Sequence, residues 1–152
     1  MCYLTHMHMW LLLSNIFAVA KVIDIGEASV SSGHHYINVR DEDYGYIVSH
    51  QSFGNADYGP NRNWKLSLTE LRSNEVELVF EEISLEQQCV WYFGCYCYDY
   101  LRTPTHLKIC GTRTRTIVEK RLPSMSITFN FITNSDNSRK GFWIQYTGKP
   151  VL

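Results

Sequence analysis

The chain has 152 residues, enough for one domain with a hydrophobic core and too few for two domains of ordinary size. Hydrophobic residues make up 45% and charged residues 19%, as in soluble globular proteins, and aromatic residues reach 14%, which favours strands over helices. The formal net charge of −1 excludes a strong field of one sign, so no nucleic-acid partner is expected.

The N-terminal segment contains an apolar run at residues 10–20 (WLLLSNIFAVA), which is too short to cross about 30 Å of bilayer hydrocarbon. The run ends in Ala18, Val19 and Ala20, the small-x-small pattern that signal peptidases cleave. We therefore predict a signal peptide over residues 1–20 and a secreted, extracellular protein. The alternative is that the run forms a buried strand or short helix of the domain. No later segment is apolar enough to predict a membrane span.

The next segment, residues 21–44 (KVIDIGEASVSSGHHYINVRDEDY), is polar and lacks a clear period. We interpret it as an N-terminal extension, part linker and part edge strand. The domain proper is predicted to occupy residues 45–148.

Apolar residues then recur at every second position in four segments. They are residues 64–68 (WKLSL), 75–80 (EVELVF), 125–131 (MSITFNF) and 142–146 (FWIQY). Strict alternation is typical of strands with one buried and one solvent-exposed face. Turn-rich stretches at residues 54–61, 72–74 and 134–141 separate these segments. The pattern predicts an all-β fold, an antiparallel β-sandwich of two sheets.

The cysteines agree with an oxidising compartment. Cys2 would leave with the signal peptide, so the mature chain keeps Cys89, Cys95, Cys97 and Cys110. Four cysteines allow two disulfides with three possible connectivities. Their spacing lacks the paired CxxC arrangement of structural zinc sites.

A series of short motifs in this region resembles the CUB domain family. The matching stretches are residues 45–49 (GYIVS), 64–66 (WKL), 78–86 (LVFEEISLE), 97–101 (CYDYL), 110–111 (CG), 125–129 (MSITF), 134–138 (NSDNS) and 141–146 (GFWIQY). Each motif alone is weak, but their order is specific and together they cover residues 45 to 147. The resemblance implies a jelly-roll-type sandwich that acts as a secreted, non-enzymatic binding module.

The resemblance also implies a disulfide pattern. Cys97 and Cys110 occupy the positions that the family joins by a disulfide. Residues 89–96 (CVWYFGCY) look inserted relative to the family, and they bring the two additional cysteines. Cys89 and Cys95 would then pair across this insertion if the chain turns at Gly94.

Members of the family that bind calcium hold the ion with acids that match Glu86, Asp99 and Asp136. Asn137 or Ser138 would add an oxygen, and Tyr58 matches a tyrosine that supports the site. Calcium takes six to eight oxygen ligands, and three converging carboxylates repel one another unless a cation joins them. The alternative is that these acids are ordinary loop and turn residues.

The resemblance further implies a partner, an extracellular protein that presents an exposed Lys or Arg. Carboxylate oxygens left free by the metal would capture this side chain, and the candidates are Glu86 and Asp99 with Tyr58 beside them. Trp91, Tyr92 and Phe93 in the insertion are the expected apolar anchors. No sequence frame places a catalytic nucleophile, so no catalytic residue is expected. Two alternatives remain: an ion that only stabilises the fold, and a chain that is the N-terminal part of a larger mosaic extracellular protease or receptor.

Overall fold

The computed structural model describes residues 21–25, 32–39, 44–70, 76–115, 118–119 and 126–148. The regular secondary structure among these residues consists of strands: β1 (Lys21–Asp24), β2 (Ser32–Asn38), β3 (Tyr44–Val48), β4 (Asn63–Thr69), β5 (Val76–Leu85), β6 (Gln87–Val90), β7 (Gly94–Cys97), β8 (Tyr100–Arg102), β9 (Lys108–Ile109), β10 (Gly111–Thr114), β11 (Val118–Glu119), β12 (Ser126–Ile132) and β13 (Gly141–Gly148). Across this part of the chain, no helix is long and apolar enough to cross a membrane. The predicted signal peptide, residues 1–20, lies outside the described residues.

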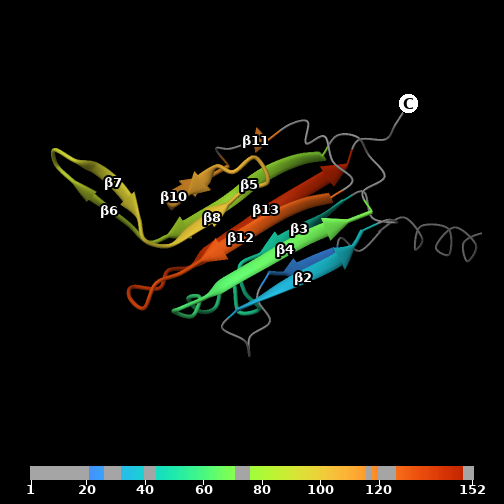
Figure 1. Cartoon of the computed structure of the whole chain (residues 1–152), viewed down its shortest axis with the longest axis horizontal. Helices are drawn as coiled ribbons and strands as arrows, with labels where there is room; N and C mark the ends of the chain where they lie inside the picture. Colours follow the sequence, from blue (N-terminus) through green and yellow to red (C-terminus); the bar gives the residue numbers. More distant parts are fainter. Residues whose placement is uncertain are drawn as a thin grey trace, which may run out of the picture.

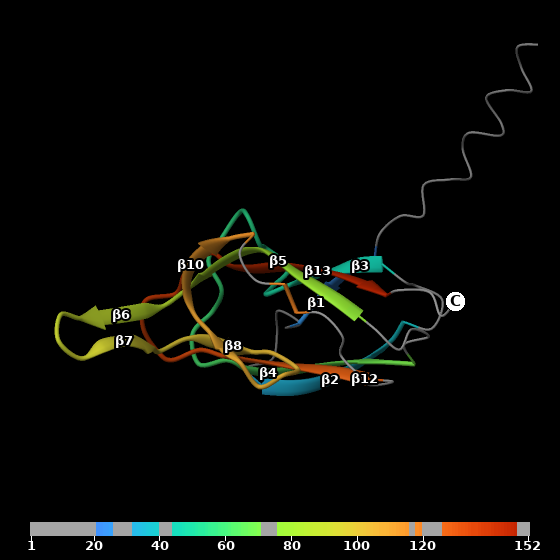
Figure 2. The ribbon, with the colours of Figure 1, turned by 90° about the horizontal axis from the view of Figure 1, so that it is seen from above.

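Two sheets pack face to face, and Figure 2 shows them as separate layers. The six-stranded sheet has the order β1-β3-β13-β5-β10, with β11 also paired to β5. The five-stranded sheet has the order β2-β4-β12-β8-β9 (Figure 1). The predicted all-β sandwich is therefore confirmed, and each of the four segments with alternating apolar residues overlaps a strand, β4, β5, β12 or β13.

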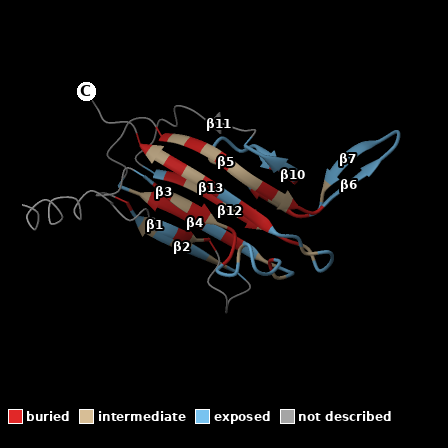
Figure 3. Ribbon diagram, turned by 180° about the vertical axis from the view of Figure 1, so that it is seen from behind, coloured by how far each residue is buried: buried red, intermediate tan, exposed pale blue. Residues whose placement is uncertain are grey.

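The core lies between the sheets, where the alternating apolar residues of each strand meet. β4 contributes Trp64, Leu66 and Leu68, and β12 contributes Phe129 and Phe131, all of them buried. Figure 3 shows buried positions concentrated along the central strands β4, β5, β12 and β13. The intervening residues of β4 and β12 point to the outer face of the five-stranded sheet, since successive side chains of a strand alternate between faces.

The segment predicted to be an extension supplies one edge strand to each sheet. β1 pairs with β3, from Lys21 opposite Gly45 to Asp24 opposite Val48. β2 pairs with β4 along its whole length. Both pairings are parallel, unlike the remaining pairings of these sheets, which are antiparallel. The described parts of residues 21–44 thus belong to the sandwich, which begins before Gly45.

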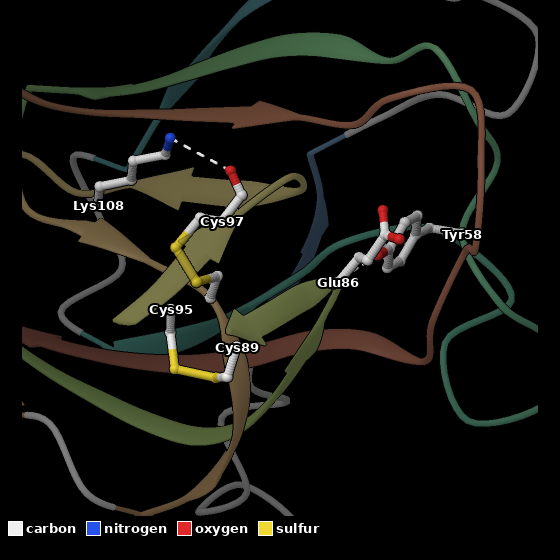
Figure 4. The surroundings of a disulfide bond; sticks show 7 residues. Tyr58, Glu86, Cys89, Cys95, Cys97 and Lys108 are labelled. Atoms are coloured by element: carbon white, nitrogen blue, oxygen red, sulfur yellow. Dashed lines mark hydrogen bonds between the residues drawn. A yellow bond between two sulfur atoms is a disulfide. The ribbon is translucent and has the colours of Figure 1, made fainter. Parts of the chain in front are cut away.

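The inserted residues form a two-stranded hairpin, β6–β7, that projects from one end of the sandwich (Figures 1 and 2). A disulfide joins Cys89 to Cys95, which face each other across the two strands. A second disulfide joins Cys97, at the base of the hairpin, to the buried Cys110 (Figure 4). The structure thus forms both disulfides that were predicted, and Gly94 has the positive φ of 85° that the turn requires.

Candidate metal and partner-binding site

Loops from three parts of the chain meet at the base of the hairpin. Glu86 lies between β5 and β6, and Asp99 lies between β7 and β8, so the hairpin emerges between these two acids. The Asp99 backbone N–H donates to the Glu86 carbonyl oxygen over 3.4 Å. The loop after β12, residues 134–138, reaches the same place, because its asparagine side chains bond Glu86 and the Asn134 backbone N–H bonds Asp99.

Asp99 is fully buried and accepts two hydrogen bonds. Its Oδ2 accepts from the Tyr58 hydroxyl at 2.5 Å, and its Oδ1 accepts from the Asn134 backbone N–H at 2.7 Å. The same Tyr58 oxygen accepts from the Glu86 backbone N–H at 3.2 Å. Tyr58 therefore joins the two acidic loops through one buried hydroxyl.

Glu86 is 8% exposed, and both of its carboxylate oxygens accept hydrogen bonds from asparagine side chains. Asn134 Nδ2 donates to Oε2 at 2.7 Å, and Asn137 Nδ2 donates to Oε1 at 2.8 Å. Asn137 has a φ of 49°, a left-handed conformation that asparagine tolerates better than most residues. Figure 4 shows the Glu86 carboxylate beside the Tyr58 ring.

Burial raises the pKa of the Asp99 carboxyl, and the nearby negative charge of Glu86 raises it further, while hydrogen bonds from Tyr58 and Asn134 act in the opposite direction. Burial, the hydrogen bond to Asp99 and the charge of Asp99 also raise the pKa of the Tyr58 hydroxyl. Tyr58 thus remains a neutral donor at physiological pH. The net raised pKa of Asp99 means that this site, as it stands, disfavours the carboxylate's negative charge.

The structure brings together Glu86 and Asp99 but not the third predicted acid. Asp136 is exposed, and its backbone N–H donates to Asn134 Oδ1 at 2.8 Å. Among the described residues, no three His, Cys, Asp or Glu side chains are placed to hold a metal ion. The expected convergence of three carboxylates is therefore absent, because the turn after β12 directs asparagine side chains, and not Asp136, at Glu86.

The donor set around Glu86 and Asp99 nevertheless consists of oxygen ligands of the kind that calcium prefers. Two carboxylates lie together, and rotating the Asn134 and Asn137 amides would present their Oδ1 atoms to a shared cation. The chemistry of these residues fits a calcium ion. Asp136 and Ser138 lie on the same loop, and Ser138 is half-buried.

Asn134 was not singled out in the sequence, although it contacts both acids. Its backbone bonds Asp99, its side chain bonds Glu86, and its carbonyl accepts from the Asn61 backbone N–H at 2.6 Å. The only signal was its place at the start of the motif of residues 134–138, where an asparagine is ordinarily interpreted as a turn former.

The far end of the hairpin presents three consecutive aromatic side chains to solvent. Trp91 is 90% exposed, Tyr92 86% and Phe93 76%. The hairpin carries no charged residue between Gln87 and Cys97. Large aromatic residues on a protruding turn are the type of side chain that dominates protein interfaces.

Replacing Tyr58 with phenylalanine is expected to lower the free energy of unfolding by about 1–3 kcal/mol, because Asp99 Oδ2 loses its donor while buried. The ring and its packing on Phe131 are retained, so the loss reports on the hydroxyl. Urea denaturation of the Tyr58→Phe variant measures it, with the exposed Tyr92→Phe as matched control. An unchanged midpoint for Tyr58→Phe would show that the hydroxyl does not support the acids.

The sequence matches no protein-family model and no curated protein. Solved structures are similar in fold. The CUB1-EGF-CUB2 domains of rat MASP-1 align with a TM-score of 0.57 and 20% identity, over 78% of this chain and 44% of that one. The full extracellular region of zebrafish Gpr126/Adgrg6 aligns with a TM-score of 0.61 and 18% identity, over 79% of this chain and 15% of that one. The MASP-1 CUB2 domain bound to Ca²⁺ aligns with a TM-score of 0.59 and 19% identity, over 77% of this chain and 99% of that one. The chain thus spans less than half of the first two structures.

Proposed function

We propose that this chain, whose fold is that of CUB domains as its sequence motifs predicted, is a secreted, non-enzymatic module that binds an extracellular protein in a calcium-dependent way. The main support is the pair of adjacent acids, Glu86 and Asp99, at the base of a hairpin with exposed aromatic residues at its end. The two disulfides agree with an oxidising, extracellular environment.

Calcium is proposed to bind between Glu86 and Asp99, with amide oxygens of Asn134 and Asn137 as further ligands. Burial, and to a smaller extent the negative charge of Glu86, raises the pKa of Asp99, so without a cation the site disfavours two ionised carboxylates. A cation removes this penalty, and a proton competes with it for Asp99. In this proposal Asp136 and Ser138 add oxygens only after their loop rearranges around the ion. The similar CUB2 domain of MASP-1 is described as bound to Ca²⁺.

Burial determines which residues can meet a partner. Asp99 and Tyr58 are buried, so in this proposal they hold the ion and Glu86 in place and do not touch the partner. Glu86 is 8% exposed, more than Asp99, and it meets the Lys or Arg of the partner. The aromatic end of the hairpin begins five residues after Glu86, which is about 16 Å along an extended strand. A partner that contacts both regions gains apolar burial in addition to one ion pair, which alone contributes about 0–1 kcal/mol.

Calcium is expected to stabilise the fold. Extracellular modules bind calcium with dissociation constants of roughly 10⁻⁴ to 10⁻³ M. Millimolar calcium then adds about 0.4–1.4 kcal/mol, which raises the melting temperature by a few degrees for a domain of this size. Thermal melts in calcium and in chelator measure the difference. Glu86→Gln should remove it, whereas Glu77→Gln, the same change on β5, should leave it intact. Equal melting temperatures of the unmutated protein in calcium and in chelator would contradict calcium binding at this site.

The partner is expected to bind in calcium, to be released by chelator, and to bind more weakly at high salt. Affinity capture from extracellular fluid, with elution by chelator, tests this directly. Trp91→Ser with Phe93→Ser should reduce capture without changing the melting temperature, because both side chains are exposed. If calcium stabilises the fold but all captured proteins resist chelation and salt, the ion has a structural role only and capture of a basic residue is the wrong mechanism.

A further inference from the structure

The outer face of the five-stranded sheet carries a row of basic and polar residues from edge to edge. Register places His34 opposite Lys65, Lys65 opposite Asn130, Asn130 opposite Arg102, and Arg102 opposite Lys108. The row thus crosses all five strands, β2, β4, β12, β8 and β9 (Figure 1). None of these strands contains an Asp or Glu. A protein with a net charge of −1 therefore has one sheet face that is locally cationic.

A pocket of about 550 Å³ opens on this face, within the range of small-molecule binding pockets. Its wall includes two cationic side chains, an imidazole, two hydroxyls and an amide, from Lys65, Arg102, His106, Ser126, Thr128 and Asn130. No acidic residue lines it. The pocket is distinct from the calcium site, because its walls come from β4, β8, β12 and the turn after β8, and include neither Glu86 nor Asp99.

Two cations of the pocket are available to a ligand. The ion pairs in the described part of the chain involve Arg115 and Lys140, and neither Lys65 nor Arg102. Arg102 lies loosely over the Tyr100 ring, with its Cζ 6.0 Å from the ring centre. Lys108 is held more closely, because its Nζ lies 3.9 Å from the same centre and donates to the Cys97 carbonyl oxygen at 3.4 Å. Lys65 and Arg102 are two strands apart, about 10 Å at their backbones. That separation suits an extended anion with charges on neighbouring units.

Asn130, a third residue of the row, favours a ligand that carries a hydrogen-bond donor as well as negative charge. Asn130 lines the pocket between Lys65 and Arg102, and its Oδ1 has no hydrogen-bond partner within the described structure. This atom is buried, so a ligand reaches it when the amide rotates toward the pocket. An unpartnered buried acceptor gains stability from an O–H or N–H donor. Inorganic sulfate in solution has no donor, and neither does a DNA phosphate. A sugar unit has both, because its hydroxyls donate to Asn130 while its sulfate or carboxylate group accepts from the two cations.

We propose that this pocket binds an acidic polysaccharide, whose sulfated or carboxylated sugar units lie along the row from Lys65 to Arg102. The cations hold the anionic groups, and Asn130 together with Thr128 bonds the hydroxyls. Binding does not depend on calcium, so this site and the proposed partner site can fail separately.

Isothermal titration calorimetry with a heparin octasaccharide, and separately with a hyaluronan octasaccharide, tests the proposal and distinguishes sulfated from carboxylated ligands. Lys65→Gln with Arg102→Gln should raise the dissociation constant about 100-fold, roughly tenfold for each charge-assisted hydrogen bond. The slope of log affinity against log salt should fall by about one to two. Arg113→Gln with Arg139→Gln removes two exposed charges outside the pocket and should change affinity less than threefold. Chelator and Glu86→Gln should have no effect.

A second measurement uses the unmutated protein. The octasaccharide that binds should protect the exposed Lys65 from acetylation but leave Lys140, which is paired with Glu82, as reactive as before. Binding of neither oligosaccharide would overturn the proposal, as would equal losses in the pocket and control variants. Inorganic sulfate that competes as well as the octasaccharide would show a simple anion site. Tighter binding of single-stranded nucleic acid at equal charge would show a different class of ligand. Either of these two results would overturn the proposal that the pocket binds an acidic polysaccharide.

Discussion

Replacing Phe131 with alanine is expected to lower the free energy of unfolding by about 3–5 kcal/mol, the cost of emptying a large aromatic site in a packed core. Phe131 is fully buried on β12. Its ring contacts Tyr58, Trp64 and Phe142, with centroid separations of 5.3, 6.0 and 5.1 Å. The substitution therefore leaves a cavity bordered by three rings from different elements, which cannot all move inward without losing other contacts.

Urea denaturation measures this loss, and Ile132→Ala is the matched control because its side chain points to the outer face of the same strand. The control should cost about 1 kcal/mol or less. Phe131→Ala should also reduce the calcium-dependent shift in melting temperature, since the Tyr58 ring that holds Asp99 packs against Phe131. A cost below about 1.5 kcal/mol for Phe131→Ala would contradict the packing described here.

Removing the Cys97–Cys110 disulfide by two serine substitutions is expected to cost about 3 kcal/mol, because this bridge closes a loop with a sequence separation of 13 residues. Cys110 is buried in the core, and Cys97 ends the hairpin, so this disulfide fixes the base of the hairpin to the sandwich. Loss of the bridge should lower both the melting temperature and the calcium response. Non-reducing peptide mapping checks the connectivity before the comparison.

The Cys89–Cys95 disulfide provides the control, because the same two substitutions fall on exposed residues of strands that pair only with each other. Opening the hairpin there should leave global unfolding within about 1 kcal/mol of the parent protein while weakening partner capture. If both double variants destabilise the sandwich equally, the hairpin is part of the cooperative core, contrary to its exposure.

The sequence predicted the strands whose inward positions are large and apolar. In β4, Trp64, Leu66 and Leu68 alternate with polar residues, and this alternation alone predicts the strand. In β2 the partly buried positions are Gly33, His35 and Ile37, so no apolar period marks it. Its parallel pairing with β4 is set by contacts distant in sequence, which a local pattern does not contain.

Of the three acids predicted to converge, the structure brings two together and leaves Asp136 apart, for a related reason. Glu86 and Asp99 follow regular strands whose ends fix where the side chains lie, and the structure brings them together. Asp136 lies in an irregular loop, where one left-handed residue, Asn137, redirects the chain. Side-chain direction in such a loop depends on backbone angles that residue type only weakly specifies. Asn134, and not Asp136, therefore contacts Glu86 and Asp99.

The two parallel edge strands affect how the module behaves toward other copies of itself. β1 and β2 cover the outer edges of β3 and β4, which would otherwise present unpaired backbone N–H and C=O groups. A variant that begins at Gly45 would retain most of the core but expose both edges, and β4 has seven residues of alternating character with which a neighbouring chain can pair. We expect such a shortened chain to undergo strand exchange and aggregation more readily than the chain that carries β1 and β2.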